Sequence, residues 1–171
     1  MMTDLLLTGL PAQVDARTRV LVLGSMPGVV SLQQQCYYAH PRNRFWPLME
    51  SLFAVPAALA YARRLGALNA AGVGLWDVIG QCRRRGSLDS AIERGSERPN
   101  DIAGLVATLP QLAVVACNGG AAHQAFMRHI APQLGPKAPP VLALPSTSPA
   151  NAGWPLPRLL EAWQPLRGYL R

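Results

Sequence analysis

One long connection between two apolar segments carries most of the side chains that suit chemistry. It runs from Gly24-Ser25-Met26-Pro27-Gly28 to Tyr37-Tyr38-Ala39-His40-Pro41-Arg42-Asn43-Arg44-Phe45-Trp46. Such connections usually have about two to six residues, and a compact domain keeps a longer one mainly when it has a function. The side chains offer aromatic faces for stacking, guanidinium groups for phosphate and an amide that can hold a water molecule. We therefore predict a functional loop.

The backbone of this loop is a second chemical resource. Glycine and proline near Ser25, Met26 and Gly28 let another molecule approach the main chain closely. Backbone N–H groups there can donate to a carbonyl oxygen or to negative charge that develops on a leaving group. Asn43 could cap the next helix, but Pro47 favours a helix start further on, which leaves Asn43 in the loop.

Several familiar motifs are missing from the sequence. No GK[ST] follows Gly24–Gly28, no GxGxxG occurs, and Ser25 does not stand in a GxSxG elbow. The three histidines lack the spacing of a zinc protease, and three cysteines cannot supply four thiolates to an iron–sulfur cluster. We therefore expect neither a metal nor another cofactor.

Composition sets the remaining bounds. The chain has 171 residues, half of them hydrophobic, which predicts one globular domain over residues 1–171. Lysine and arginine total 16 against nine acids, for a net charge of +7. Nearly all of this basic charge is arginine, which suits phosphate contact, although GC-rich coding also enriches arginine. No signal peptide or membrane span is visible, so we expect a cytoplasmic protein.

The loop needs a scaffold, and apolar runs predict one. We expect strands at 20–24, 73–79, 112–117 and 141–144. Helical patterns fall near 45–54, 57–70, 88–93, from Asn100 as N-cap, 120–130 and from about Pro157. A basic turn is expected at Cys82–Gly86, with Arg83-Arg84-Arg85 as a solvated face. The alternation favours an α/β fold: a three-layer α/β/α sandwich with a central, mainly parallel four-stranded sheet.

Ligands bind to open α/β sheets beyond the carboxyl ends of the strands. That rule places the loop after Gly24, Asp77, Asn118 and the loop Pro145–Asn151 on one edge of the sheet. Asp77 is the one carboxylate expected there, and it suits either a general base or a turn or helix cap.

The motifs as a group resemble the uracil-DNA glycosylase superfamily. The Gly-x-x-Pro-Gly segment and the Tyr37–Trp46 block look most like its hypoxanthine-DNA glycosylase branch, with the mismatch-specific uracil-DNA glycosylases next. Leu75-Trp76-Asp77-Val78-Ile79, Gly86-Ser87-Leu88-Asp89-Ser90-Ala91-Ile92 and Pro145-Ser146-Thr147-Ser148-Pro149-Ala150-Asn151 are similar to that branch as well. The resemblance extends from about residue 20 to the C-terminus.

This resemblance implies an enzyme that removes a deaminated base from DNA, most simply hypoxanthine, with uracil and xanthine as further substrates. In the mismatch-specific relatives a catalytic asparagine stands where this chain has Met26. The hypoxanthine branch also lacks it and is similar in placing an asparagine at the position of Asn43. We therefore expect Asn43 to hold the attacking water, with Asp77 as the possible base. In the relatives' second motif an apolar wedge enters the base stack, and this chain has Ser148-Pro149 near that place.

Base removal requires the nucleotide to leave the stack and enter a pocket. Tyr38 is the expected stacking face, with Tyr37 or Phe45 as substitutes, whereas Trp46 suits core packing. The residues expected to contact the substrate are Ser25, Met26, Pro27, Gly28, Tyr38, Phe45 and Asn118. Those expected to contact DNA are Arg42, Arg44, Ser146, Thr147, Ser148 and Asn151.

We expect the protein to act as a monomer on double-stranded DNA that contains a deaminated base. Two other functions fit the same residues. One is a nucleoside or nucleotide N-glycosidase that uses the pocket on small substrates. The other is a DNA-binding module without activity, suggested by Met26 and the basic charge.

Overall fold

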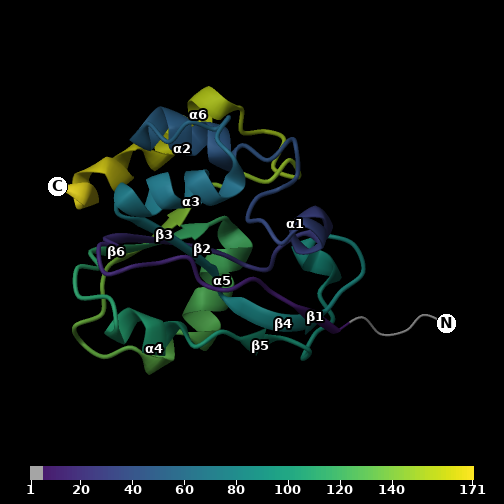
Figure 1. The fold of residues 1–171 in the computed structure, drawn as a ribbon. Coiled ribbons are helices and arrows are strands. Elements are labelled where there is room, and N and C mark those ends of the chain that lie inside the picture. The colour runs from purple at the N-terminus through teal and green to yellow at the C-terminus, as the bar shows by residue number, and fades with distance from the viewer. Residues whose placement is uncertain (1–5) are drawn as a thin grey trace.

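The computed structural model describes residues 6–171, and its centre is a parallel sheet of four strands (Figure 1). The strands are β2 (Val20–Gly24), β3 (Val73–Asp77), β6 (Val114–Asn118) and β7 (Val141–Leu144), in the order β3-β2-β6-β7. The register pairs Gly24 with Asp77 and Asn118 with Leu144, so the strands end at a common edge. The predicted fold class is confirmed.

Helices cover both faces of this sheet (Figure 1). One layer holds α2 (Phe45–Phe53), α3 (Tyr61–Ala70) and α6 (Leu156–Trp163), and the other holds α4 (Ile102–Ala107) and α5 (Gly120–His129). Strand β2 is buried on both sides because a layer of helices covers each face of the sheet. Its alternate residues point to opposite faces. Val20 and Val22 belong to the core under the first layer, and Leu21 and Leu23 to the core under the second.

A second, antiparallel sheet was not predicted. It consists of β1 (Leu6–Thr8), β4 (Ile79–Arg83) and β5 (Arg98–Pro99), in the order β1-β4-β5. The predicted strand over 73–79 therefore ends at Asp77, and the predicted basic turn is partly strand. β4 is the central strand, because it pairs with β1, far away in the sequence, and with β5.

Other differences are local. The long loop contains a short helix, α1 (Val29–Gln34), and the helix predicted near 88–93 is a 3-10 turn at Asp89–Ala91. Further 3-10 segments lie at Ala131–Gln133 and Gln164–Leu170. Asn100 is not the cap of α4, because Asp101 caps it by accepting from the N–H of Gly104.

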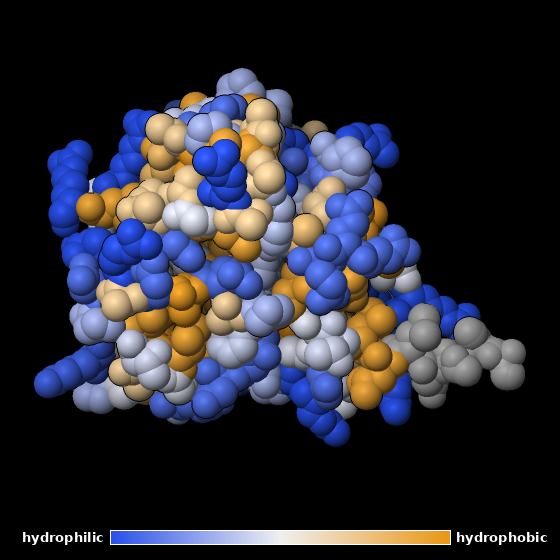
Figure 2. Space-filling model, viewed as in Figure 1, coloured by the Kyte–Doolittle hydropathy of each residue, from blue (hydrophilic) through white to orange (hydrophobic). Residues whose placement is uncertain are grey.

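Within residues 6–171, no helix has the length and apolar character that crossing a membrane requires. On the face shown in Figure 2, hydrophilic side chains divide the apolar ones into small areas. Leu6 is one exposed apolar side chain, and it lies at the beginning of β1. Most of the large apolar side chains are instead buried in the two cores beside the parallel sheet.

Candidate active site

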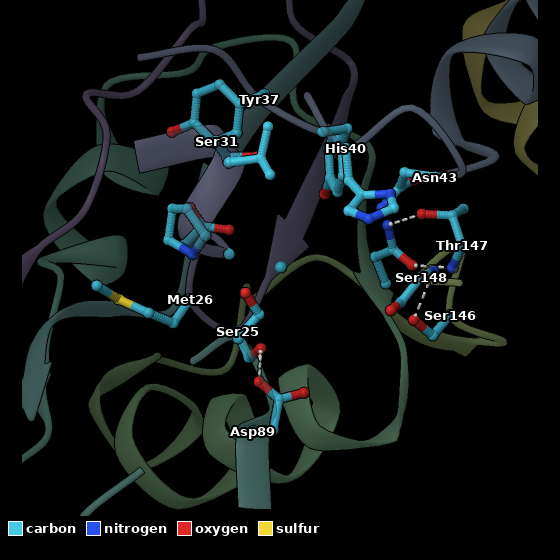
Figure 3. Close-up of a pocket in the computed structure, with 18 of the residues that line it drawn as sticks. Ser25, Met26, Ser31, Tyr37, His40, Asn43, Asp89, Ser146, Thr147 and Ser148 are labelled. Carbon is cyan, nitrogen blue, oxygen red and sulfur yellow. Dashed lines mark hydrogen bonds between the residues drawn. The ribbon is translucent and has the colours of Figure 1, made fainter. Parts of the chain in front are cut away.

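A cavity of about 170 Å³ lies at the carboxyl edge of the parallel sheet (Figure 3). It brings together most of the predicted site residues, namely Ser25, Met26, Pro27, Gly28, Tyr38, Asn43, Asp77, Asn118, Ser146, Thr147 and Ser148. Other lining residues were not assigned from the sequence, namely Val29, Val30, Ser31, His40, Ser87, Asp89 and Pro149. Tyr37, predicted as a substitute for Tyr38, also lines it.

The segment Gly24–Gly28 forms one wall through its main chain. A Cβ atom on Gly24 would lie 2.5 Å from Oδ1 of Asp77, so glycine is needed for this close approach. The Met26 side chain is buried with Ile79 and Cys82, and Figure 3 shows it pointing away from the cavity. The backbone N–H groups of Ser25, Met26 and Gly28 have no hydrogen-bond acceptor among residues 6–171. These donors are therefore available to a ligand.

Asp77 lies deep in the cavity, at the end of β3, with only 4% of its surface exposed. Its Oδ2 is buried and has no partner among the described residues. Burial, and then the charge of Asp89, raise the pKa of Asp77 to about 7, against the lowering influence of Arg84 and the Gly24 backbone. Such a carboxyl can exchange a proton near neutral pH, as a general base must.

Asn43 is held in a fixed orientation just ahead of α2. Its Oδ1 accepts from the backbone N–H of Phe45 at 2.9 Å, and the backbone N–H of Asn43 donates to the carbonyl of His40. The Nδ2 donor therefore remains for the cavity that Asn43 lines. Helix α2 begins at Phe45, as Pro47 predicted.

His40 is a lining residue that the sequence analysis left without a role. Its Nδ1 accepts from the backbone N–H of Arg42 at 3.0 Å, which directs Nε2 away from that turn. Figure 3 places the ring beside Asn43 and the Ser146–Ser148 segment. Its position three residues before Asn43 in the same loop was the available signal.

Tyr38 stacks on Phe45, with ring centroids 4.0 Å apart and planes at 21°. Phe45 is fully buried and lies behind Tyr38, so the prediction that Phe45 contacts the substrate is wrong. Tyr38 has a φ of +54°, a left-handed backbone that non-glycine residues rarely adopt. Such strain is typical of functional positions. Tyr38 lines the cavity, and Phe45 covers one face of its ring.

Asn118 and Thr147 form a buried pair rather than two separate contact sites. The Asn118 Nδ2 donates to Oγ1 of Thr147 at 3.1 Å, and the Thr147 N–H donates to Oδ1 of Asn118 at 3.0 Å (Figure 3). Thr147 is fully buried. It therefore cannot reach a phosphate, and the pair instead joins β6 to the loop after β7.

Arg44 also differs from its predicted role. Its guanidinium donates to the carbonyls of Thr147, Ser148, Asn151 and Trp154, so its donors are used inside the protein. The Asn151 amide likewise donates to the carbonyl of Ser146. Arg44 and Asn151 therefore stabilise the loop after β7.

Asp89 is a second carboxylate at the cavity, and it was missed because it comes from a distant segment. Its Oδ1 accepts from the Ser25 hydroxyl at 2.6 Å (Figure 3). The conspicuous Gly86–Ile92 block was the signal that could have found it. Across residues 6–171, no three or more His, Cys, Asp or Glu side chains are grouped so as to hold a metal ion.

Comparison with known proteins agrees with this geometry. The family model of the uracil DNA glycosylase superfamily matches residues 11–167. A Methanosarcina acetivorans protein named hypoxanthine DNA glycosylase is 37% identical over 144 residues, which are 84% of this chain and 87% of that protein. One of the same name from Methanosarcina barkeri is 38% identical over 65% of this chain and 70% of its own length.

Among solved structures, a solution NMR structure of a uracil DNA glycosylase candidate from Methanosarcina acetivorans superposes with a TM-score of 0.81. The two are 32% identical, and the match covers 97% of this chain and 99% of the other. Both the sequence and the fold thus lead to the same group. The chain belongs to the uracil DNA glycosylase superfamily.

Proposed function

We propose that this protein is a DNA glycosylase that removes hypoxanthine, the deaminated form of adenine, from double-stranded DNA. The observation that carries the proposal is the 37% identity, over most of the chain, to a protein named hypoxanthine DNA glycosylase. The cavity at the sheet edge supports it with the Asn43 amide, the buried Asp77 carboxyl and backbone N–H groups that have no acceptor within the described part of the chain. Uracil and xanthine are further substrates to test.

In the proposed reaction, the damaged nucleotide leaves the duplex and its base enters the cavity. The bond between the base and C1′ breaks, and its electron pair leaves with the base. A water held by Nδ2 of Asn43 forms the new bond to C1′ and gives its proton to Asp77. Backbone N–H groups of Ser25, Met26 and Gly28 stabilise the negative charge on the departing base.

The test uses duplexes that carry hypoxanthine, uracil or xanthine at one position. Formation of an abasic site is scored by strand cleavage in alkali. Free deoxyinosine, assayed in parallel, distinguishes a DNA glycosylase from a nucleoside N-glycosidase. Excision from none of the duplexes would contradict the proposal.

We further propose that the protein acts as a single-domain monomer in the cytoplasm. Two buried cores share one parallel sheet, which supports a single domain. Sedimentation of the free protein and of its complex with a short duplex measures the oligomeric state.

Tyr38→Leu is expected to lower excision about tenfold to a hundredfold, because base stacking on an aromatic face is worth roughly 1–3 kcal/mol. Binding to undamaged duplex is expected to change little, since no base is extruded there. Tyr38→Phe is the matched control, because it keeps the ring and removes only a hydroxyl without a partner among the described residues. Equal weakening on both duplexes would show that Tyr38 is structural.

Arg42→Ala is expected to weaken binding to damaged and intact duplexes alike and to reduce the salt slope by about one. Arg42 is exposed, and only its backbone bonds to His40. Binding is measured at several salt concentrations, with the exposed Arg63 on α3 changed to alanine as the control. An unchanged dependence of binding on salt would show that Arg42 does not contact DNA.

A further inference from the structure

Arg84 is a buried cation that the proposed reaction leaves without a role. It follows β4 between the exposed Arg83 and Arg85, yet only 4% of its surface is exposed. The expectation of a solvated face at Arg83–Arg85 was therefore wrong for the middle residue. The backbone explains this, because Arg84 bridges to Ile92 and continues the strand alternation that turns successive side chains to opposite sides.

The Arg84 side chain uses one of its donor groups within the described part of the chain. Its Nη2 donates to the carbonyl oxygen of Pro27 at 2.6 Å, whereas Nε and Nη1 are buried without a partner there. A buried charge with unused donors is costly to a folded protein. Arg83, by contrast, is exposed and pairs with Glu93 at 3.7 Å.

The bond to Pro27 connects Arg84 with the cavity wall. The carbonyl of Pro27 and the N–H of Gly28 belong to one peptide group. A cation that donates to the carbonyl draws electron density toward it and makes the N–H at the other end a stronger donor. Gly28 lines the cavity, and its N–H has no partner among residues 6–171.

The surroundings of Arg84 contain negative charge that it does not neutralise by direct pairing. Asp77 and Asp89 lie near enough to act on it electrostatically, but neither forms an ion pair with it within the described residues. Two carboxylates at a cavity oppose the departure of a base as an anion. A positive charge behind the wall offsets them.

We propose that Arg84 is a positioning residue for the departing base: its charge, transmitted through the Pro27–Gly28 peptide, prepares the Gly24–Gly28 main chain to receive negative charge. This inference rests on the proposed glycosylase function. The leaving base takes the electron pair of the broken bond to C1′, and water supplies the new bond. Arg84 exchanges no proton and touches no reacting atom.

The test compares Arg84→Gln with Arg83→Gln, which makes the same charge change at an exposed neighbour. Single-turnover excision is measured on duplexes with hypoxanthine and with 2-fluorohypoxanthine, whose fluorine makes the departing anion more stable. Arg84→Gln is expected to slow hypoxanthine excision at least tenfold and to slow the fluorinated base clearly less. Arg83→Gln is expected to stay within about twofold of the wild type on both.

A structural role would slow both bases equally, and that outcome would overturn the inference. Arg84→Lys retains the charge and is expected to recover most of the lost rate, so failure to recover would overturn it as well. Thermal unfolding of each variant shows whether it is folded. If Arg84→Gln does not fold, the lysine variant is compared with the wild type on the two bases, and a changed ratio counts against the inference.

A second readout needs no catalysis. The Asp77 carboxyl is titrated by NMR in the wild type and in Arg84→Gln. The groups that act on Asp77 are Asp89 from the 3-10 turn, Arg84 after β4, and Tyr37, Tyr38 and Tyr61 from the loop and α3. The pKa of Asp77 is expected to rise in the variant, and an unchanged value would mean that the charge is not felt at the cavity. If the wild type has no excision activity, the proposed glycosylase function is contradicted, whereas the titration still tests whether the charge of Arg84 acts on the cavity.

Discussion

Replacing Asn43 with serine is expected to lower single-turnover base excision by about a hundredfold to a thousandfold, the usual cost of losing one positioned donor in an active site. Serine can still accept from the N–H of Phe45, as Oδ1 of Asn43 does, but its shorter side chain has no donor group at the position of Nδ2. The helix start is therefore preserved while the water loses its holder. Excision and thermal unfolding are measured together.

Asn43→Ala is the companion variant because it removes both the donor and the oxygen that accepts from the N–H of Phe45. It is expected to lose the same activity and, in addition, about 1 kcal/mol of stability. The two variants thus separate the chemical role of Asn43 from its structural one. Activity of Asn43→Ser within a few-fold of the wild type would assign the water to another group, with His40 the next to change.

The elements that the sequence predicted best are those that depend on local pattern alone. Strands β2 and β7 have the expected bounds because each is an apolar run bounded by polar or turn residues. Helix α2 begins where Pro47 allows. Strand β4 could not be predicted in this way, because it depends on two partner strands, β5 and the distant β1 at the N-terminal end of the described chain.

For the site, too, the sequence predicted the position of the loops but not the contacts of individual side chains. The sequence located the loops that surround the cavity because parallel strands bring their carboxyl ends together. The sequence did not show that Arg44, Thr147 and Arg84 form hydrogen bonds within the protein. The same type of side chain can be buried or exposed, depending on the groups that surround it. The Arg44 donors meet carbonyl groups, and the Thr147 hydroxyl meets Asn118.

Excision is expected to increase with pH through the pKa of Asp77, which is raised to about 7. The carboxylate accepts a proton only when it is ionised, so activity should be low near pH 5 and level off above about pH 8. Asp77→Asn cannot ionise and is expected to lose this pH dependence together with at least about a hundredfold in rate. The wild-type profile without a rise in this range would exclude Asp77 as the base.

The same variant is expected to be more stable than the wild type at neutral and higher pH. Because folding raises the pKa of Asp77 from 3.8 to about 7, the folded state retains the proton longer. The wild type therefore loses stability as the pH rises between these two values, by up to about 4 kcal/mol, and then stays level. Asp77→Asn avoids this loss, so its advantage in the free energy of unfolding should be absent near pH 4 and complete near pH 8. Urea unfolding at both pH values measures it, with Glu161→Gln as a control at an exposed carboxylate. A variant that loses activity and stability together would instead make Asp77 a structural residue.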